Sequence, residues 1–186
     1  MTEIRISGYG GQGIIRCGYI IGKATSLYDN KYATLTQSFG PEARGSACSA
    51  QVLVSEDKIL YPYVTLPHIL VAMSQEAYTK FSPNLDLNGI LIIDDDLVTL
   101  QEARGNIKTY AIPSTRLAEE MGAKIVANIV MLGFFTAITG VITPEAAKKA
   151  VSDSVPQRLV DLNLRAFEKG FKFGQEVKEV SKVEKV

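Results

Sequence analysis

The sequence has few of the side chains that build metal, redox and triad sites. It contains one histidine, His68, two cysteines, Cys17 and Cys48, and no tryptophan. Because His68 is alone and opens an apolar stretch, a Ser-His-Asp triad and a histidine-based metal site both lack their parts, and we expect it to be structural. The cysteines are too far apart for a CxxC motif and too few for an iron–sulfur cluster with four thiolates. We expect both to be reduced and buried.

A charge excess and a long uninterrupted apolar run are also missing. Lysine and arginine total 20, as do aspartate and glutamate, so the chain has no basic excess for a nucleic-acid partner. The longest apolar stretch, residues 125–142, is interrupted by Asn128 and by glycines, which favours a core helix over a membrane span. The first residues enter a strand without the pattern of a signal peptide. We therefore expect a cytoplasmic protein with no nucleic-acid and no membrane partner.

What the sequence does contain is strands that alternate with helices. At 186 residues the chain is expected to form one domain that buries roughly 70% of its unfolded surface. Apolar runs predict strands at residues 3–7, 32–39, 47–55, 68–73, 89–93 and 109–112. A helix is predicted from the glycine-rich residues 8–13 to about Leu27, and helices with breaks at Gly122, 140–144 and 155–156 follow Ser114.

This pattern predicts an α/β fold: a single doubly wound sandwich domain, residues 1–177, with a mostly parallel sheet and helices on both faces. Residues 178–186 are a charged tail that we expect to fray. Ligands of such sheets bind at the carboxyl ends of the strands, so the polar strand ends should converge on one edge.

Two polar strand ends each allow two interpretations. Ser74-Gln75-Glu76 either lines a cleft at this edge or, through Ser74, caps the next helix. Asp94-Asp95-Asp96 suggests magnesium, but carboxylates after a buried strand commonly cap the next helix, and we favour that role. Asn128, within an apolar helix, is expected to satisfy a buried backbone or interface group.

The glycine-rich loop matches part of a dinucleotide fingerprint, Gly8-x-Gly10-x-x-Gly13. The full fingerprint also needs an acidic residue at the end of the second strand, and that strand ends in Thr36-Gln37-Ser38-Phe39 without one. Asp29 falls in the turn before the strand, where such a residue is ordinary turn chemistry. A simpler alternative is that the glycines only let the helix pack tightly on the strand. An anion at the helix start would gain only about 0.3–1 kcal/mol and would need help from a cation or from a second loop, and Arg44 is a candidate.

An ordered set of short motifs covers nearly the whole chain. It consists of Gly8-x-Gly10-Gly11-Gln12-Gly13, Phe39-Gly40-Pro41-Glu42-Ala43-Arg44-Gly45, Ser55 with Ile59 and Pro62, Ala72-Met73-Ser74-Gln75-Glu76-Ala77, residues 89–94, Asn128 with Gly133, and Val155-Pro156 with Asn163, Ala166, Phe167 and Gly170. This set resembles the gamma subunit of 2-oxoacid:ferredoxin oxidoreductases.

The resemblance implies one subunit of a complex that decarboxylates a 2-oxoacid oxidatively on thiamine diphosphate, reduces ferredoxin through iron–sulfur clusters and forms an acyl-coenzyme A. No Gly-Asp-Gly diphosphate motif occurs here, so thiamine diphosphate, its magnesium and the clusters are expected in other subunits, and the isolated chain is expected to be inactive. The implied partners are the thiamine-binding and ferredoxin-like subunits and coenzyme A as substrate. The isolated chain is expected to be either a monomer or a homodimer.

The resemblance also implies a part in receiving coenzyme A. The candidate binding residues are Gly10, Gly11, Gln12, Gly13, Arg44, Ser74 and Gln75; no catalytic residue and no metal ligand is assigned. The glycine loop would offer backbone and amide donors, and Arg44 a forked cation, unless Arg44 pairs with Glu42 within its own loop. Overall resemblance favours 2-oxoglutarate, with pyruvate, branched-chain and aryl 2-oxoacids left open. The alternatives are a stand-alone nucleotide-binding protein and a purely structural assembly subunit.

Overall fold

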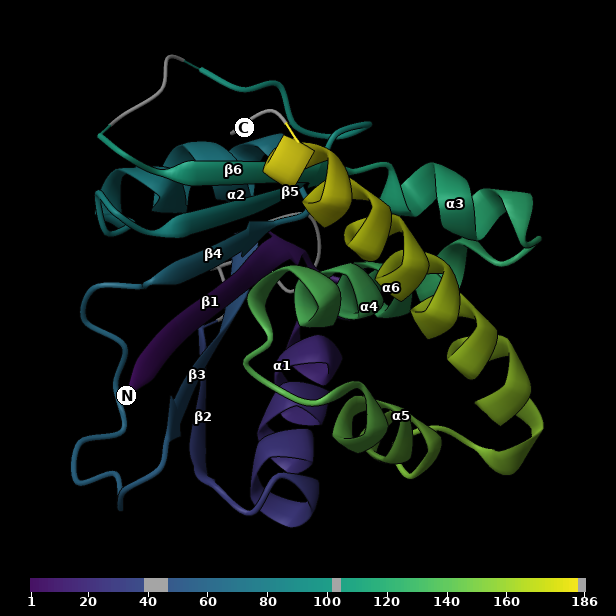
Figure 1. The fold of residues 1–186 in the computed structure, drawn as a ribbon, viewed down its shortest axis with the longest axis horizontal. Coiled ribbons are helices and arrows are strands. Elements are labelled where there is room, and N and C mark those ends of the chain that lie inside the picture. Colours follow the sequence, from purple (N-terminus) through teal and green to yellow (C-terminus); the bar gives the residue numbers. More distant parts are fainter. Residues whose placement is uncertain (39–46, 102–104, 184–186) are drawn as a thin grey trace.

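The computed structural model of the chain describes residues 1–38, 47–101 and 105–183, with side chains described to residue 180. Six strands form one sheet in the order β2-β3-β1-β4-β5-β6 (Figure 1). The strands are β1 (Thr2–Tyr9), β2 (Tyr32–Ser38), β3 (Ala47–Ser55), β4 (Ile69–Ala72), β5 (Ile90–Asp94) and β6 (Lys108–Ile112). All six predicted strands are therefore confirmed, with bounds that shift by at most two residues.

The predicted mostly parallel sheet is also confirmed. Strands β1, β4, β5 and β6 pair in parallel, so their carboxyl ends meet at one edge of the sheet. The departure is β3, which lies between β2 and β1 and runs antiparallel to both. Because the apolar strands β4 and β5 have a buried side chain at nearly every position, both faces of the sheet must be covered around them.

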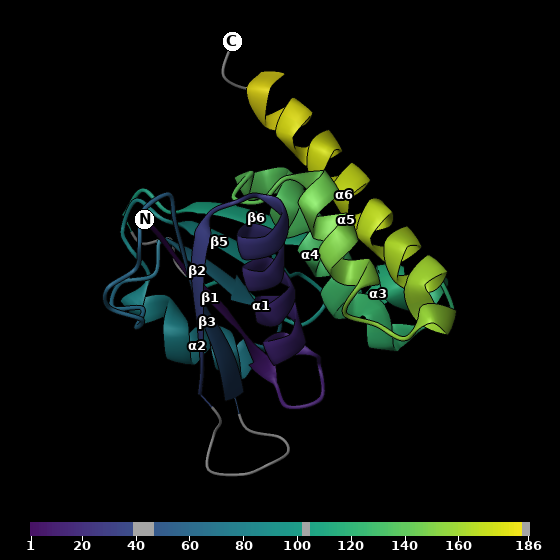
Figure 2. The same ribbon diagram turned by 90° about the horizontal axis from the view of Figure 1, so that it is seen from below.

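Helices cover both faces, but unequally (Figures 1 and 2). Among the described helices, only α2 (Gln75–Phe81) lies on one face. The other face carries α1 (Ile14–Lys23), continued by a π-helical turn at Ala24–Tyr28, together with α3 (Ser114–Glu120), α4 (Ala127–Thr139), α5 (Pro144–Ser152) and α6 (Val160–Val183). Short 3₁₀ turns lie at Ser82–Asn84, Lys124–Val126 and Gln157–Leu159. Helix α6 continues past residue 178, whereas the predicted domain boundary at residue 177 and the fraying of the tail stay predictions.

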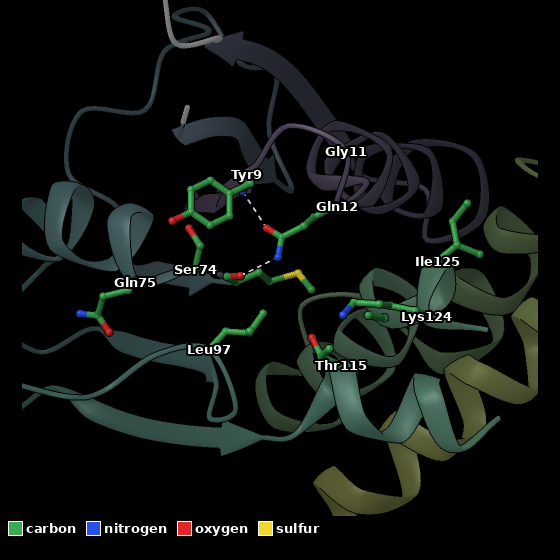
Figure 3. A pocket seen from close by; sticks show the side chains of 11 residues that line it. Tyr9, Gly11, Gln12, Ser74, Gln75, Leu97, Thr115, Lys124 and Ile125 are labelled. Carbon is green, nitrogen blue, oxygen red and sulfur yellow. Dashed lines mark hydrogen bonds between the residues drawn. The ribbon is translucent and has the colours of Figure 1, made fainter. Parts of the chain in front are cut away.

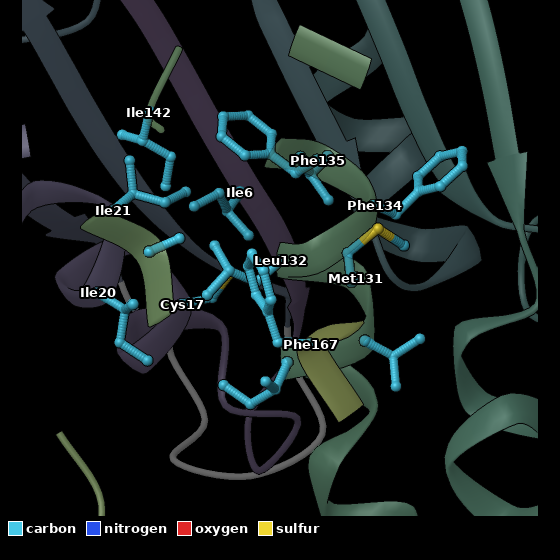
Figure 4. Packing of buried hydrophobic residues seen from close by; sticks show 14 of the residues in the cluster. Ile6, Cys17, Ile20, Ile21, Met131, Leu132, Phe134, Phe135, Ile142 and Phe167 are labelled. Atoms are coloured by element: carbon cyan, nitrogen blue, oxygen red, sulfur yellow. The ribbon is translucent and has the colours of Figure 1, made fainter. Parts of the chain in front are cut away.

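The larger core lies between the sheet and α4, an almost wholly apolar helix (Figure 4). There Phe134 and Phe135 of α4 pack with Ile6 of β1, Ile20 of α1 and Phe167 of α6. This confirms that the apolar stretch around Asn128 is a core helix. None of the described helices combines the length and the apolar character that a membrane crossing requires.

Helices α4 and α6 cross backbone against backbone. A Cβ atom added at Gly133 would lie 2.0 Å from the carbonyl oxygen of Phe167, and one at Gly170 would lie 1.8 Å from that of Val130. Any larger residue at either position would therefore push the two helices apart. The predicted helix breaks are confirmed nearby: Gly140 ends α4 with φ 64°, and Thr143 caps α5 with Pro144 in its first turn.

Candidate functional site

A cavity of about 520 Å³ opens at the carboxyl ends of the parallel strands (Figure 3). Three strand ends contribute to it, as the predicted convergence of polar strand ends requires. The cavity is lined by Tyr9, Gly11 and Gln12 after β1, Met73, Ser74 and Gln75 after β4, Leu97 after β5, Thr115 of α3, and Lys124, Ile125 and Ala127 beyond it. Four of the seven candidate residues thus share one cavity: Gly11, Gln12, Ser74 and Gln75.

Two glycines of the loop, Gly11 and Gly13, differ in the space around them: Gly11 borders open space, and Gly13 is packed against another residue. Gly11 has φ 102°, which favours glycine, and a Cβ atom added there would meet nothing within 4 Å. Gly13 has φ 76° at the start of α1, and a Cβ atom there would lie 2.3 Å from Nδ2 of Asn128. Tight packing therefore explains Gly13 but does not explain Gly11, whose exposed backbone lies at the cavity.

Asn128 holds the start of α1 against the start of α4. Its Nδ2 donates to the carbonyl oxygen of Gly13 over 3.2 Å, and the residue is only 4% exposed. The predicted role of Asn128 as a partner of a buried backbone group is confirmed. This contact fixes where the N–H groups at the start of α1, which have no partners within the helix, point.

Gln12 joins two of the strand ends through its side-chain amide (Figure 3). Its Oε1 accepts from the backbone N–H of Tyr9 at 2.7 Å, and its Nε2 donates to the carbonyl oxygen of Met73 at 2.8 Å. One of the two Nε2 hydrogens is therefore committed to the protein, which leaves a single amide donor for a ligand. The main effect of Gln12 is to lock the loop after β1 to the end of β4.

Ser74 and Gln75 are both engaged within the fold. The Ser74 hydroxyl accepts from the backbone N–H of Ala77 at 3.2 Å, so the helix-capping interpretation is confirmed, although the buried residue also lines the cavity. Gln75 accepts from the backbone N–H of Thr99 at 2.7 Å through Oε1. These contacts rigidify the cavity wall that the two residues form.

Asp94 anchors helix α3 from the end of β5. Its buried Oδ2 accepts from the Ser114 hydroxyl at 2.6 Å, the Thr115 hydroxyl at 2.7 Å and the Thr115 N–H at 3.0 Å. The predicted structural role is confirmed, although Asp94 binds the first turn of α3 from a neighbouring strand, while the N-cap position itself is Pro113. The carboxylate oxygens of Asp94, Asp95 and Asp96 also lie within 4.8 Å of one another, and burial together with these neighbouring charges raises the pKa of Asp95.

Lys124 is the cavity residue that the sequence did not reveal. Its ammonium group points into the cavity and donates to Glu119 Oε1 at 2.8 Å, a contact that raises the pKa of Lys124 (Figure 3). The side chain is 72% exposed, so the charge stays available to solvent or to a ligand. Lys124 lies in a short 3₁₀ turn without any motif, whereas Thr115 could have been expected from its place after β6.

The other three candidate residues are Gly10, Gly13 and Arg44. Gly13 lies at the start of α1 against Asn128 and does not line the cavity. Gly10 is exposed in the turn after β1. Arg44, with its alternative partner Glu42, lies outside the described residues. Ala47, the first described residue after Arg44, pairs with Tyr9 at the carboxyl end of β1.

The histidine and the cysteines are structural, as predicted. His68 Nδ1 accepts from the backbone N–H of Glu3 at 2.9 Å. Cys17 and Cys48 are buried free thiols, and burial raises the pKa of Cys17 to about 12. Thiols held protonated in this way are poor ligands for a metal cluster.

The fold and the place of the cavity define an α/β protein with a cavity at the carboxyl edge of its sheet, the edge at which doubly wound folds bind their ligands. More narrowly, the chain belongs to the pyruvate ferredoxin/flavodoxin oxidoreductase family, whose model matches residues 3–173. It is 47% identical over 177 residues to the 2-oxoglutarate synthase subunit KorC of Methanocaldococcus jannaschii. The aligned residues cover 94% of this chain and 95% of that relative.

Solved structures agree. The gamma subunit of a keto/oxoacid ferredoxin oxidoreductase from Geobacter sulfurreducens is 44% identical with a TM-score of 0.83, covering 94% of this chain and 98% of that one. A 2-oxoglutarate:ferredoxin oxidoreductase from Magnetococcus marinus, solved with 2-oxoglutarate, coenzyme A and succinyl-CoA bound, is 25% identical with a TM-score of 0.86 over 94% of this chain and 31% of that one. The predicted resemblance to gamma subunits of 2-oxoacid:ferredoxin oxidoreductases is confirmed, and other subunits of such a complex are the partners of this chain.

Proposed function

We propose that this chain is the gamma subunit of a complex that converts 2-oxoglutarate and coenzyme A into succinyl-CoA and carbon dioxide while reducing ferredoxin. The choice of substrate rests on the sequence identity to relatives. Two subunits of 2-oxoglutarate synthases are 47% and 48% identical to this chain, whereas a pyruvate synthase subunit is 32% and a ketoisovalerate oxidoreductase subunit 28% identical.

The redox cofactors belong to other subunits in this proposal. A four-thiolate cluster does not fit two buried cysteines, one of which, Cys17, is held protonated by burial. The chain also lacks the Gly-Asp-Gly motif that binds the diphosphate of thiamine. The contribution of this chain is therefore binding and positioning at the face where the complex meets coenzyme A.

The carboxyl-edge cavity is the observation that carries this role. Coenzyme A combines anionic phosphates with an uncharged arm, and the cavity combines a cation, Lys124, with the apolar side chains of Met73, Leu97 and Ile125. The start of α1 adds backbone N–H groups, which favour anions. Gly11 leaves its backbone exposed beside them, and we assign Gly10 and Arg44 to the same face from their place in the chain.

The substrate is tested by reconstitution. The chain is co-produced with the other subunits of its complex, and coenzyme A-dependent reduction of ferredoxin is measured with 2-oxoglutarate, pyruvate and 2-oxoisovalerate. We expect kcat/KM for 2-oxoglutarate to exceed the other two values by about tenfold or more. A preference for pyruvate or 2-oxoisovalerate would contradict the substrate assignment but not the family.

The role of Arg44 is tested in the same complex. Arg44→Ala removes a charge-assisted contact, so the KM for coenzyme A should rise by an amount that corresponds to about 1.5–3 kcal/mol. An unchanged KM and turnover would remove Arg44 from the site and favour pairing with Glu42. Submicromolar binding of NAD or FAD to the isolated chain, measured by calorimetry, would instead favour the stand-alone nucleotide-binding alternative.

A further inference from the structure

The face of the sheet that carries α2 changes from apolar to polar between β4 and β1 (Figure 2). One row of paired residues crosses five strands on this face and shows the change: Thr36, Gln51, Arg5, Leu70 and Leu91. Leu70 and Leu91 are buried in the apolar cluster under α2. Arg5, Gln51 and Thr36 are only half-buried. The part of this face formed by β1, β3 and β2 is therefore not an apolar core surface.

Several polar atoms on this part of the face have no partner. The Nε atom of Arg5, Oγ1 of Thr36 and Oγ of Ser49 are buried and make no hydrogen bond with the described residues. Ser49 belongs to the same face, because it lies on β3 two residues from Gln51, and it is 1% exposed. Buried polar groups of folded proteins nearly always have a partner. Three such atoms in two neighbouring rows point to a partner from outside the chain.

Arg5 and Lys80 add two cations that lack an acid. Cζ of Arg5 lies 5.0 Å and Nζ of Lys80 5.4 Å from the centroid of the Phe81 ring. Among the residues that the structure describes, no carboxylate oxygen lies within 4.0 Å of either cation. The Glu3 carboxylate, on the same face of β1, already accepts the backbone N–H groups of residues 65–66. Two positive charges thus face one negative charge.

We propose that this polar patch, defined by Arg5, Thr36, Ser49, Gln51 and Lys80, receives an aspartate or glutamate side chain of another subunit of the complex. A guanidinium that contacts an aromatic ring keeps N–H donors that match the two oxygens of a carboxylate. Gln51 adds amide donors directly beside Arg5, and Lys80 adds a second charge at the exposed rim. One carboxylate also supplies the single negative charge that the patch lacks.

Two other occupants fit the patch less well. A second copy docked here by a twofold axis would place Arg5 and Lys80 against the same two cations, and like charges repel. A free small anion would need a concave site, whereas the patch residues line neither the cavity of about 520 Å³ nor the groove of about 270 Å³ between α1 and β2. A side chain carried by another subunit brings its own cover. The proposal rests on membership in the complex and not on the substrate or on coenzyme A.

The test is the strength with which the assembled complex holds this chain. Complexes with Arg5→Gln or Lys80→Gln are compared over a dilution series by native mass spectrometry, which reports release of the chain. The control is Arg158→Gln, since Arg158 is an exposed arginine in the turn before α6. We expect the dissociation constant of the chain to rise about tenfold or more in Arg5→Gln, about twofold to fivefold in Lys80→Gln and not at all in the control. Circular dichroism and thermal melts show whether each variant chain is folded.

A carbodiimide identifies the carboxylate without weakening the contact, because it couples an amine to a neighbouring carboxyl group. In the assembled complex, Lys80 and the amine introduced by Arg5→Lys should both become cross-linked to an aspartate or glutamate of another subunit, which peptide mapping assigns. Cross-links that form only within this chain or between two copies of it overturn the proposal, as does equal retention of Arg5→Gln and Arg158→Gln. Binding of glutarate to the isolated chain that Arg5→Gln abolishes would assign the patch to a free carboxylate and also overturn it.

Discussion

The crossing of α4 and α6 and the cavity at the carboxyl edge both depend on glycine, but for opposite reasons. At Gly170 the space that a side chain would fill holds the backbone of another helix, because a Cβ atom would lie 1.8 Å from the carbonyl oxygen of Val130. At Gly11 a Cβ atom would meet nothing within 4 Å. Packing within the chain thus accounts for the first glycine, whereas the second has a positive φ and borders open space, which we propose a ligand or a partner subunit fills.

The largest effect on stability is expected at the α4–α6 crossing. Gly170→Ala forces a methyl group into the α4–α6 contact, so we expect a loss of about 3 kcal/mol or more in the free energy of unfolding, or failure to fold. Gly22→Ala is the matched control, since Gly22 also lies in a helix but a Cβ atom there meets nothing within 4 Å. The control should gain about 0.5–1 kcal/mol, measured by urea unfolding. Equal stabilities for the two variants would show that the crossing is not closed.

The next effect on stability concerns the wall of the carboxyl-edge cavity. Asp94→Ala removes three hydrogen bonds from Ser114 and Thr115 to a buried carboxylate, so unfolding should become easier by about 2–4 kcal/mol. Asp95→Ala is the control, because Asp95 is exposed and should change stability by less than about 0.5 kcal/mol. If Asp94→Ala is as stable as its control, the cavity wall does not depend on this anchor.

The sequence predicted the strands and the core helix α4 better than it predicted the residues of the cavity. Apolar runs located all six strands, and the interrupted stretch around Asn128 located α4. The reversed strand β3 was not foreseen, because periodicity reports which side chains face inward but not the direction of the neighbouring strand. Likewise the glycine loop and the polar ends of β4 and β5 were placed at one edge, while Lys124 was missed because nothing in its neighbourhood forms a motif.

A pH-dependent effect is expected in the core beside α4, to which Cys17 of α1 belongs. Cys17 ionises with a pKa of about 12 in the folded chain against 9.0 for a free thiol. Above pH 9 the unfolded chain loses this proton and the folded chain keeps it, so stability should fall by about 1.4 kcal/mol per pH unit until the pH reaches 12. Cys17→Ala should reduce this slope, measured by urea unfolding at pH 9 and pH 10.

Thiol labelling compares the buried Cys17 with an exposed cysteine at the cavity and gives an independent check. Cys17 should react with iodoacetamide only after unfolding, whereas a cysteine introduced by Ile125→Cys at the cavity should react as a free thiol does. Rapid labelling of Cys17 in the folded chain would contradict the burial of this thiol. The same would follow if Cys17→Ala kept the wild-type dependence of stability on pH.

The most direct test of the account is the affinity of the assembled complex for coenzyme A when Lys124 is replaced. Lys124→Ala removes the cation that points into the cavity. Lys148→Ala, which removes a half-buried lysine paired with Glu168, is the control. We expect the KM for coenzyme A to rise only about fivefold in Lys124→Ala, because the site is exposed, with kcat unchanged and no change in the control. If Lys124→Ala and Lys148→Ala show the same KM as the unmodified complex, the cavity does not contact coenzyme A through this residue and the central claim is contradicted.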